Sequence, residues 1–278
     1  MKFFRLIIFF LLAGLCIGGV KFFFELKRSV FWDLQRVNLV VVSHQSNKTA
    51  IISFSDKKGK IFVLPEEKQV EVVRGFGLYK LGKVFALGEL EKKGGLLLKE
   101  TVQENFKIPV FGYIFEENLD FSRLKKNFWP VKKKNRQTDL SFEDLLILFI
   151  KTKFIPEFST ENFREDQLED NFVDADIRDE AIPVEILNGT EHQGLAQKAF
   201  LQWENIGGRV VRVADSNLEG QPECKILFTD KVRESYSLKI MKEIYDCKSE
   251  QAGEIQQGRV DLSLTLGENY WKKIREKW

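Results

Sequence analysis

The sequence contains few of the side chains that usually carry out catalysis or bind metals. It has two histidines, His44 and His192, and three cysteines, Cys16, Cys224 and Cys247. It lacks the CxxC, HExxH, GxSxG and GxxxxGK[ST] patterns, which are typical of zinc or redox sites, zinc peptidases, serine hydrolases and phosphate-binding loops. Each histidine is predicted to be a surface or turn residue rather than a base or a ligand. The sequence therefore predicts no cofactor and no metal site.

One turn in the C-terminal third could bind an anion. Asn188, Gly189 and Thr190 follow a short apolar run, and Gly194 begins the helix predicted next. A turn that leads into a helix can direct backbone N–H groups at an anion. The alternative is that these residues only end a strand and start a helix, because Asn-Gly favours tight turns.

The segments around this turn alternate between strands and helices. Apolar residues share one helical face across residues 195–206, and Gly207-Gly208 ends that helix. Residues 260–266 alternate apolar and polar side chains, as a half-buried strand does. With the strands expected at 209–213 and 225–229 and a helix at 235–246, the order over Pro183–Trp271 is βαββαβ. This order predicts a two-layer sandwich, ferredoxin-like in its simplest connection.

These motifs resemble the C-terminal domain of LytR-CpsA-Psr envelope proteins. The resemblance rests on the series of a strand, the NGT turn, a helix starting with GLA, a Gly-Gly stop and a closing strand that ends in LGENY. It covers roughly a third of the chain. It implies a location in a bacterial cell envelope, and it supplies no active site.

The N-terminus independently indicates the same location. Phe3–Phe24 is an apolar run about as long as a helix needs to cross a hydrocarbon core ~30 Å thick. Its charged residues, Arg5 and Lys21, lie near the ends, where their side chains can reach the headgroups. We predict an uncleaved transmembrane anchor over residues 1–25, with the soluble part outside the cytoplasm. A cleaved signal peptide, or a lipoprotein modified at Cys16, are the alternatives.

The charges of the chain are nearly balanced, with 43 basic and 41 acidic residues, so no global field favours nucleic acid. Locally, residues 123–136 form a basic run and residues 157–180 are strongly acidic. We interpret both as solvated surfaces of a charged helical connector over residues 117–182. Contact of the basic run with anionic polymer or lipid headgroups is the alternative.

Residues 37–116 are predicted to form a small α/β domain. Strand-like runs at 37–43, 49–55 and 60–64 precede two short helices within 82–106 and a strand at 108–115. This order resembles the first half of the catalytic LytR-CpsA-Psr domain. Lys83-Val84-Phe85-Ala86 with Gly88 matches its helix start, and Ile108-Pro109 with Tyr113 matches its later strand.

The catalytic residues of that family are where this chain departs from it. The family transfers a lipid-linked glycopolymer phosphate to peptidoglycan, and it binds the pyrophosphate with arginines and a carboxylate-held magnesium ion. Pro65-Glu66-Glu67 stands where the family has Pro-Arg-Asp, so the charge of the second position is reversed. Arg74 and Lys80 are the remaining candidates for phosphate contacts. The domain therefore resembles a shortened, degenerate transferase domain.

Cys224 and Cys247 are predicted to form a disulfide. They bracket the strand at 225–229 and the helix at 235–246, whose ends can lie side by side in an α/β unit. Two cysteines in an exported domain are usually paired. Two buried free thiols are the alternative, and a metal site would need more ligands than these cysteines and His192 provide.

The predicted architecture is α/β, with an N-terminal transmembrane helix, the degenerate domain over 37–116, the connector over 117–182 and the C-terminal sandwich over 183–271. We expect a single-pass, extracytoplasmic protein of the cell envelope that binds or scaffolds at the cell wall, with cell-wall polymer or another envelope protein as its partner. The residues favour a non-catalytic role. The alternative is a divergent glycopolymer phosphotransferase.

Overall fold

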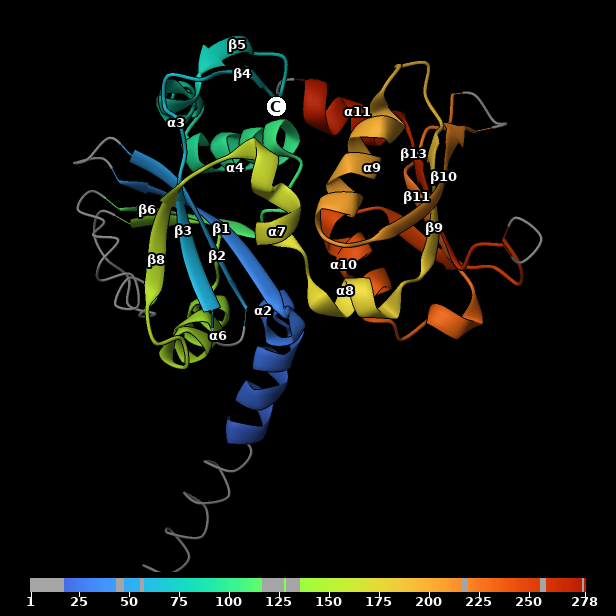
Figure 1. The fold of residues 1–278 in the computed structure, drawn as a ribbon, viewed down its shortest axis with the longest axis horizontal. Helices are drawn as coiled ribbons and strands as arrows, with labels where there is room; N and C mark the ends of the chain where they lie inside the picture. The colour runs from blue at the N-terminus through green and yellow to red at the C-terminus, as the bar shows by residue number, and fades with distance from the viewer. Residues whose placement is uncertain are drawn as a thin grey trace, which may run out of the picture.

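The computed structural model describes residues 18–43, 48–55, 58–116, 128, 136–216, 220–255, 259–276 and 278. Two β-sheets, each covered by helices, lie side by side (Figure 1). The chain is a mixed α/β protein, as the sequence predicts.

Residues 18–28 are helical and lead into α2 (Val30–Asp33) at the base of the first sheet (Figure 1). Among the residues that the structure describes, no helix is long and apolar enough to cross a membrane. Most of the predicted anchor, residues 1–17, lies outside these residues. The anchor therefore stays a prediction.

The first sheet has six strands in the order β7-β6-β1-β2-β3-β8. In chain order these are β1 (Arg36–Ser43), β2 (Lys48–Ser55), β3 (Lys58–Val63), β6 (Gly112–Glu116), β7 (Arg136–Thr138) and β8 (Phe158–Asn162). β1, β2 and β3 are antiparallel, while β6 runs parallel to β1 and β8 runs parallel to β3. A separate hairpin is formed by β4 (Gln69–Val72) and β5 (Gly77–Lys80).

Helices cover both faces of the first sheet because its central strands are apolar on both faces. Val40 and Val42 of β1 belong to one core cluster, with α4 (Gly94–Phe106) and α3 (Leu81–Glu89). Leu39 and Val41 belong to the other, with α2 and α6 (Phe142–Lys153). Successive strand residues point to opposite faces, so this alternation produces a three-layer arrangement. The two short helices were predicted from the sequence, and α6 lies within the segment predicted as a helical connector.

The segment predicted as a connector instead supplies part of the first sheet. Within residues 117–182, β7 and β8 form both edges of this sheet, and α6 packs beneath it. The first layered unit therefore extends well beyond residue 116. Most of the basic run predicted at 123–136 lies outside the described residues. The acidic part contains α7 (Leu168–Phe172) and α8 (Ala175–Glu180), which lead to the second sheet.

The second sheet has five strands in the order β10-β9-β13-β11-β12. These are β9 (Pro183–Asn188), β10 (Arg209–Asp215), β11 (Lys225–Phe228), β12 (Lys248–Gln251) and β13 (Leu262–Leu266). The helices are α9 (Leu195–Asn205), α10 (Tyr236–Tyr245) and α11 (Glu268–Arg275). The predicted strands and helices are present, together with β12 and α11, which were not predicted.

The ferredoxin-like connection expected for this domain is wrong. A ferredoxin-like sheet is antiparallel, whereas β9 pairs in parallel with both β10 and β13, and β11 pairs in parallel with β12. Only β11 and β13 are antiparallel. The physical reason is that the β9-α9-β10 and β11-α10-β12 crossover units each join two strands that lie next to each other in the sheet. Such a unit makes its two strands parallel.

The two sheets and their helices share a continuous apolar core. Residues from β1, α6, β9, α9 and α10 belong to one cluster of buried side chains. Polar contacts join the same parts: the Tyr236 hydroxyl donates to Asp174 (2.8 Å) and accepts from the backbone N–H of Gln35 (2.9 Å). Arg36 donates to the carbonyl of Val173 (2.8 Å). The two halves therefore pack as one body in this structure.

Candidate functional site

The predicted corner, Pro65-Glu66-Glu67, forms the turn between β3 and β4. The carbonyl of Glu66 accepts a hydrogen bond from the backbone N–H of Gly82 (3.0 Å), which ties the turn to the start of α3. Glu67 is exposed and forms an ion pair with Lys80 (2.6 Å), which lowers the pKa of the Glu67 carboxyl. Lys80 is therefore paired with Glu67, one of the acids of this turn.

Arg74 is held in a different place and by a different acid. It lies in the turn of the β4–β5 hairpin, while Lys80 lies at the opposite end, where it pairs with Gln69. The guanidinium of Arg74 donates two hydrogen bonds to the carboxylate of Glu100 on α4 (2.9 and 2.7 Å). It also stacks near the ring of Trp278, 5.2 Å from the centroid. The structure does not bring the two predicted phosphate contacts together.

The Asn-Gly-Thr turn uses its polar groups internally. The Asn188 Oδ1 atom accepts hydrogen bonds from the backbone N–H (3.2 Å) and hydroxyl (2.8 Å) of Thr190. The N–H of Gly189 donates to the carbonyl of Leu266 on β13 (2.9 Å). Gly194 has a φ of 80°, which a residue with a side chain adopts at a cost, and it caps α9. The geometry supports the interpretation of this turn as the join between a strand and a helix.

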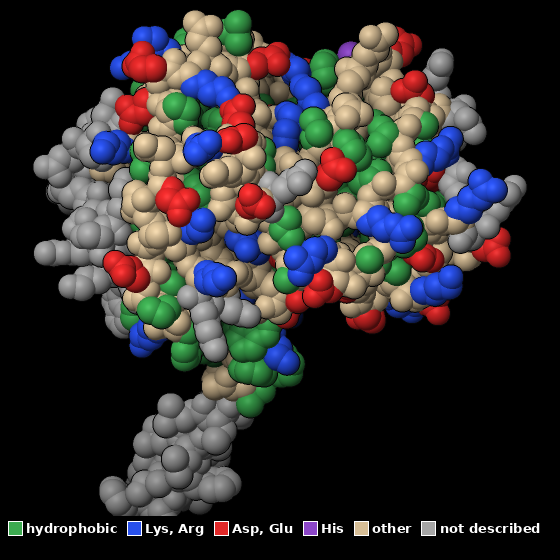
Figure 2. Space-filling model, viewed as in Figure 1, with side chains coloured by type: hydrophobic (Ala, Val, Ile, Leu, Met, Phe, Trp, Pro, Cys, Tyr) green, Lys and Arg blue, Asp and Glu red, His purple; other side chains and the backbone are tan. Residues whose placement is uncertain are grey.

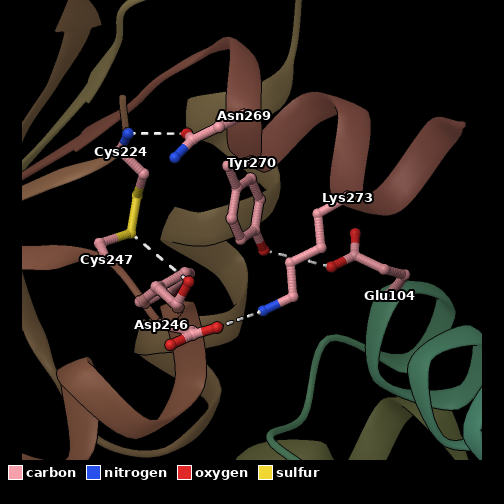
Figure 3. Close-up of a disulfide and its surroundings, with 8 residues drawn as sticks. Glu104, Cys224, Asp246, Cys247, Asn269, Tyr270 and Lys273 are labelled. Carbon is pink, nitrogen blue, oxygen red and sulfur yellow. Dashed lines mark hydrogen bonds and ion pairs between the residues drawn. A yellow bond between two sulfur atoms is a disulfide. The ribbon is translucent and has the colours of Figure 1, made fainter. Parts of the chain in front are cut away.

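Cys224 and Cys247 form the predicted disulfide, with their Cα atoms 5.0 Å apart (Figure 3). Cys224 precedes β11 and Cys247 precedes β12, and Lys225 pairs with Lys248 in the parallel register. The bond therefore joins the beginnings of two neighbouring strands. This differs in detail from the expectation that the bond links the strand at 225–229 to the end of the helix at 235–246.

The helix α11 lies between this disulfide and the first unit (Figure 3). The backbone N–H of Cys224 donates to the side chain of Asn269 (2.7 Å). The hydroxyl of the next residue, Tyr270, donates to the carboxylate of Glu104 on α4 (3.4 Å). Lys273 forms an ion pair with Asp246 (3.0 Å). His192, one of the two histidines, stacks on Trp271 of the same helix with ring centroids 3.8 Å apart.

A charged cleft that the sequence analysis missed lies where α4 meets α9 and α11. Its volume is about 170 Å³, and it is lined by Glu71, Val73, Glu104, Asn105, Lys107, Lys198, Ile274 and Arg275. The lining residues come from segments separated by up to 204 positions in the chain. No local motif or periodicity could therefore have indicated this site.

Burial shifts the pKa values of two ionisable groups of the cleft. Burial raises the pKa of the Glu104 carboxyl and lowers the pKa of the Lys107 ammonium, because both charged forms lose solvation. The hydrogen bond from Arg275 lowers the pKa of Glu71. Titratable groups that are buried around a cavity are typical of functional sites. Within the described ranges, no group of His, Cys, Asp and Glu side chains could hold a metal ion.

No family model and no curated protein matches the chain. Among solved structures, the chain is similar to B. subtilis TagT, with a TM-score of 0.35 and 16% identity over 49% of this chain and 80% of that one. It is also similar to a transcriptional regulator from Enterococcus faecalis, with a TM-score of 0.34 and 13% identity over 46% of this chain and 75% of that one. Protein gbs0355 from Streptococcus agalactiae is similar with a TM-score of 0.34 and 10% identity over 46% of this chain and 76% of that one. Scores this low establish no common fold, so the family remains a prediction.

Proposed function

We propose that this protein is a membrane-anchored, extracytoplasmic component of a bacterial cell envelope that binds or scaffolds at the cell wall without catalysing phosphate transfer. The envelope location rests on the resemblance of the C-terminal motifs to LytR-CpsA-Psr proteins and on the apolar N-terminal run. Its partner is cell-wall polymer or another envelope protein.

The non-catalytic role rests on one observation: both candidate phosphate-binding cations are paired with carboxylates. Cleaving a pyrophosphate builds negative charge that free, converging cations must stabilise. Arg74 donates both of its bonded N–H groups to Glu100, and Lys80 is bound to Glu67. A phosphate would have to displace one carboxylate at each position, and the two cations would still lie at opposite ends of the hairpin.

Exposed apolar side chains near helix 18–28 support the membrane anchor. Phe142 and Ile150 of α6 and Phe154, its C-cap residue, are spaced eight and four positions apart, with exposed fractions of 51%, 45% and 72%. Figure 2 shows apolar side chains gathered where helix 18–28 leaves the folded part. Large exposed apolar patches usually contact a membrane or a partner. A bilayer that held residues 1–25 would lie next to this patch.

An activity assay tests the non-catalytic role. Full-length protein in detergent is incubated with a polyprenyl-pyrophosphate analogue and Mg²⁺, and released phosphate is measured. We expect no turnover above that of a buffer control. Turnover that both Arg74→Ala and Lys80→Ala abolish, while Lys231→Ala leaves it intact, would instead establish the divergent glycopolymer phosphotransferase.

Fractionation of cells tests the anchor and its orientation. We expect the uncleaved chain in the membrane fraction, with residues 183–278 digested by protease added to intact spheroplasts. A soluble mature form that begins near residues 20–25 contradicts the anchor, and a C-terminus protected from protease contradicts the orientation.

A further inference from the structure

The cleft between α4, α9 and α11 contains more positive than negative charge. Its cations are Lys107, Lys198 and Arg275, and its acids are Glu71 and Glu104. Arg275 and Glu71 neutralise each other through two hydrogen bonds. Two lysines then remain opposite the single carboxylate of Glu104.

Neither of these lysines forms an ion pair with an acid among the residues that the structure describes. The Lys107 ammonium donates to the backbone carbonyl of Glu104, which leaves two of its three N–H groups for another acceptor. Within the described part of the chain, the Lys198 ammonium has no hydrogen bond or ion pair, although its side chain is half-buried and lines the cleft. The Glu104 carboxylate accepts a hydrogen bond from Tyr270. It attracts both lysines through space, but among the described residues it forms no hydrogen bond or ion pair with either ammonium.

The size of the cleft limits what could satisfy them. Its volume of about 170 Å³ is far above the ~15 Å³ that one ordered water needs, and below the ~300 Å³ at which pockets for drug-sized ligands begin. A group of a few heavy atoms fits, with some water. We propose that the cleft binds a single oxyanion group, a phosphate or a carboxylate, between Lys107 of the first unit and Lys198 of the second.

This site differs from the predicted corner, and it requires neither an anchor nor phosphate transfer. Lys107 follows α4 in a left-handed conformation with φ of 54°, and its carbonyl accepts from the side chain of Asn205 on α9 (2.8 Å). Lys107 is therefore held against α9, the helix that carries Lys198. An oxyanion bound there contacts both halves of the molecule.

Calorimetric titration of the full-length protein in detergent tests the proposal. Inorganic phosphate and acetate are each titrated at constant ionic strength, with chloride as the reference anion. We expect saturable binding of phosphate, acetate or both, and the anion that binds more tightly identifies the group. Lys198→Ala should raise the dissociation constant about tenfold, because it removes a charge-assisted hydrogen bond. Lys198→Arg should largely restore binding.

Two further variants separate a built site from general attraction to positive charge. Glu104→Gln should tighten binding several-fold, because it removes the like charge that the oxyanion meets and keeps a group that can accept from Tyr270. Lys231→Ala, at an exposed lysine outside the cleft, should change nothing. The proposal is overturned if neither anion binds beyond chloride, if Lys198→Ala binds like the wild type, or if Lys231→Ala weakens binding as much as Lys198→Ala.

Discussion

The guanidinium of Arg74 and the carboxylate of Glu100 form a two-point ion pair between the β4–β5 hairpin and α4. The side chains are only 11% and 19% exposed. The backbone N–H of Arg74 also donates to the carbonyl of Ile274 on α11 (2.7 Å). A residue that the sequence suggested for phosphate binding is thus part of the contact between the two halves.

We expect Arg74→Ala to lower the free energy of unfolding by about 2 to 3 kcal/mol, because it leaves the Glu100 carboxylate unpaired and mostly out of water. Chemical denaturation measures the change. Lys80→Ala is the matched control, and it should have no measurable effect because its pair with Glu67 is solvated. Equal losses in the two variants would contradict this interpretation of Arg74.

Reduction of the disulfide should also destabilise the protein. Cys224 and Cys247 are 23 positions apart, and closing a loop of this length stabilises by about 3 kcal/mol in the chain-entropy model. The free energy of unfolding of the oxidised protein is compared with that of the double variant Cys224→Ser/Cys247→Ser. Non-reducing mass spectrometry of protein isolated from its native cells should find the bond. Two free thiols in that material would refute the pairing in the cell.

Stability should depend on pH through Glu104. Its pKa is raised above the ordinary value of 4.5, chiefly by burial, with opposing attraction from Lys107, Lys198 and Arg275. The folded state therefore holds the proton more tightly than the unfolded state, so the contribution of Glu104 to stability falls as the pH rises from 4.5 through the raised pKa.

The variant Glu104→Gln provides the measurement for this prediction. It resembles protonated Glu104 at every pH, so its stability relative to the wild type should increase as the pH rises above 4.5. Denaturation curves of both proteins at several pH values give the difference. A difference that shrinks with rising pH would mean that the attraction of the neighbouring cations outweighs the burial of the carboxyl.

Gly95 in α4 should not tolerate alanine. Alanine favours a helix interior over glycine by ~1 kcal/mol, but a Cβ atom here would lie 1.9 Å from Cε2 of Tyr113. We expect a net loss of about 1 to 3 kcal/mol from this overpacking. In a Tyr113→Ala background the same substitution should become neutral or stabilising. Loss of stability in both backgrounds would exclude the ring of Tyr113 as the cause.

The sequence indicated the long elements well because their signals are local. The apolar spacing of Leu98, Val102 and Phe106 predicts one buried face of α4, and all three are buried. Ser235 was expected at the start of its helix, and its side chain accepts from the backbone N–H of Leu238. The disulfide was also predictable, since it needed only two cysteines beside one βαβ unit.

The elements that were missed carry almost no local signal. β12 (Lys248–Gln251) consists of polar, exposed residues and exists because β11 pairs with it. β7 and β8 are likewise short and lie at the edges of the first sheet. The charged cleft depends on three helices that meet only in the folded protein. Lys107 and Lys198 are ordinary solvated lysines by every sequence criterion, so only tertiary structure brings them together.

The position of β13 has a consequence for the biosynthesis of the protein. The strand in the middle of the second sheet is the last to be made, and until Leu262–Leu266 arrives, β10–β9 and β11–β12 are two unconnected parallel pairs. During synthesis, β9 and β11 therefore each expose an unpaired edge that can recruit other chains. The second sheet closes only after residue 266 has emerged. A nascent chain that stalls before residue 262 consequently presents two open edges, which a chaperone or a protease can recognise.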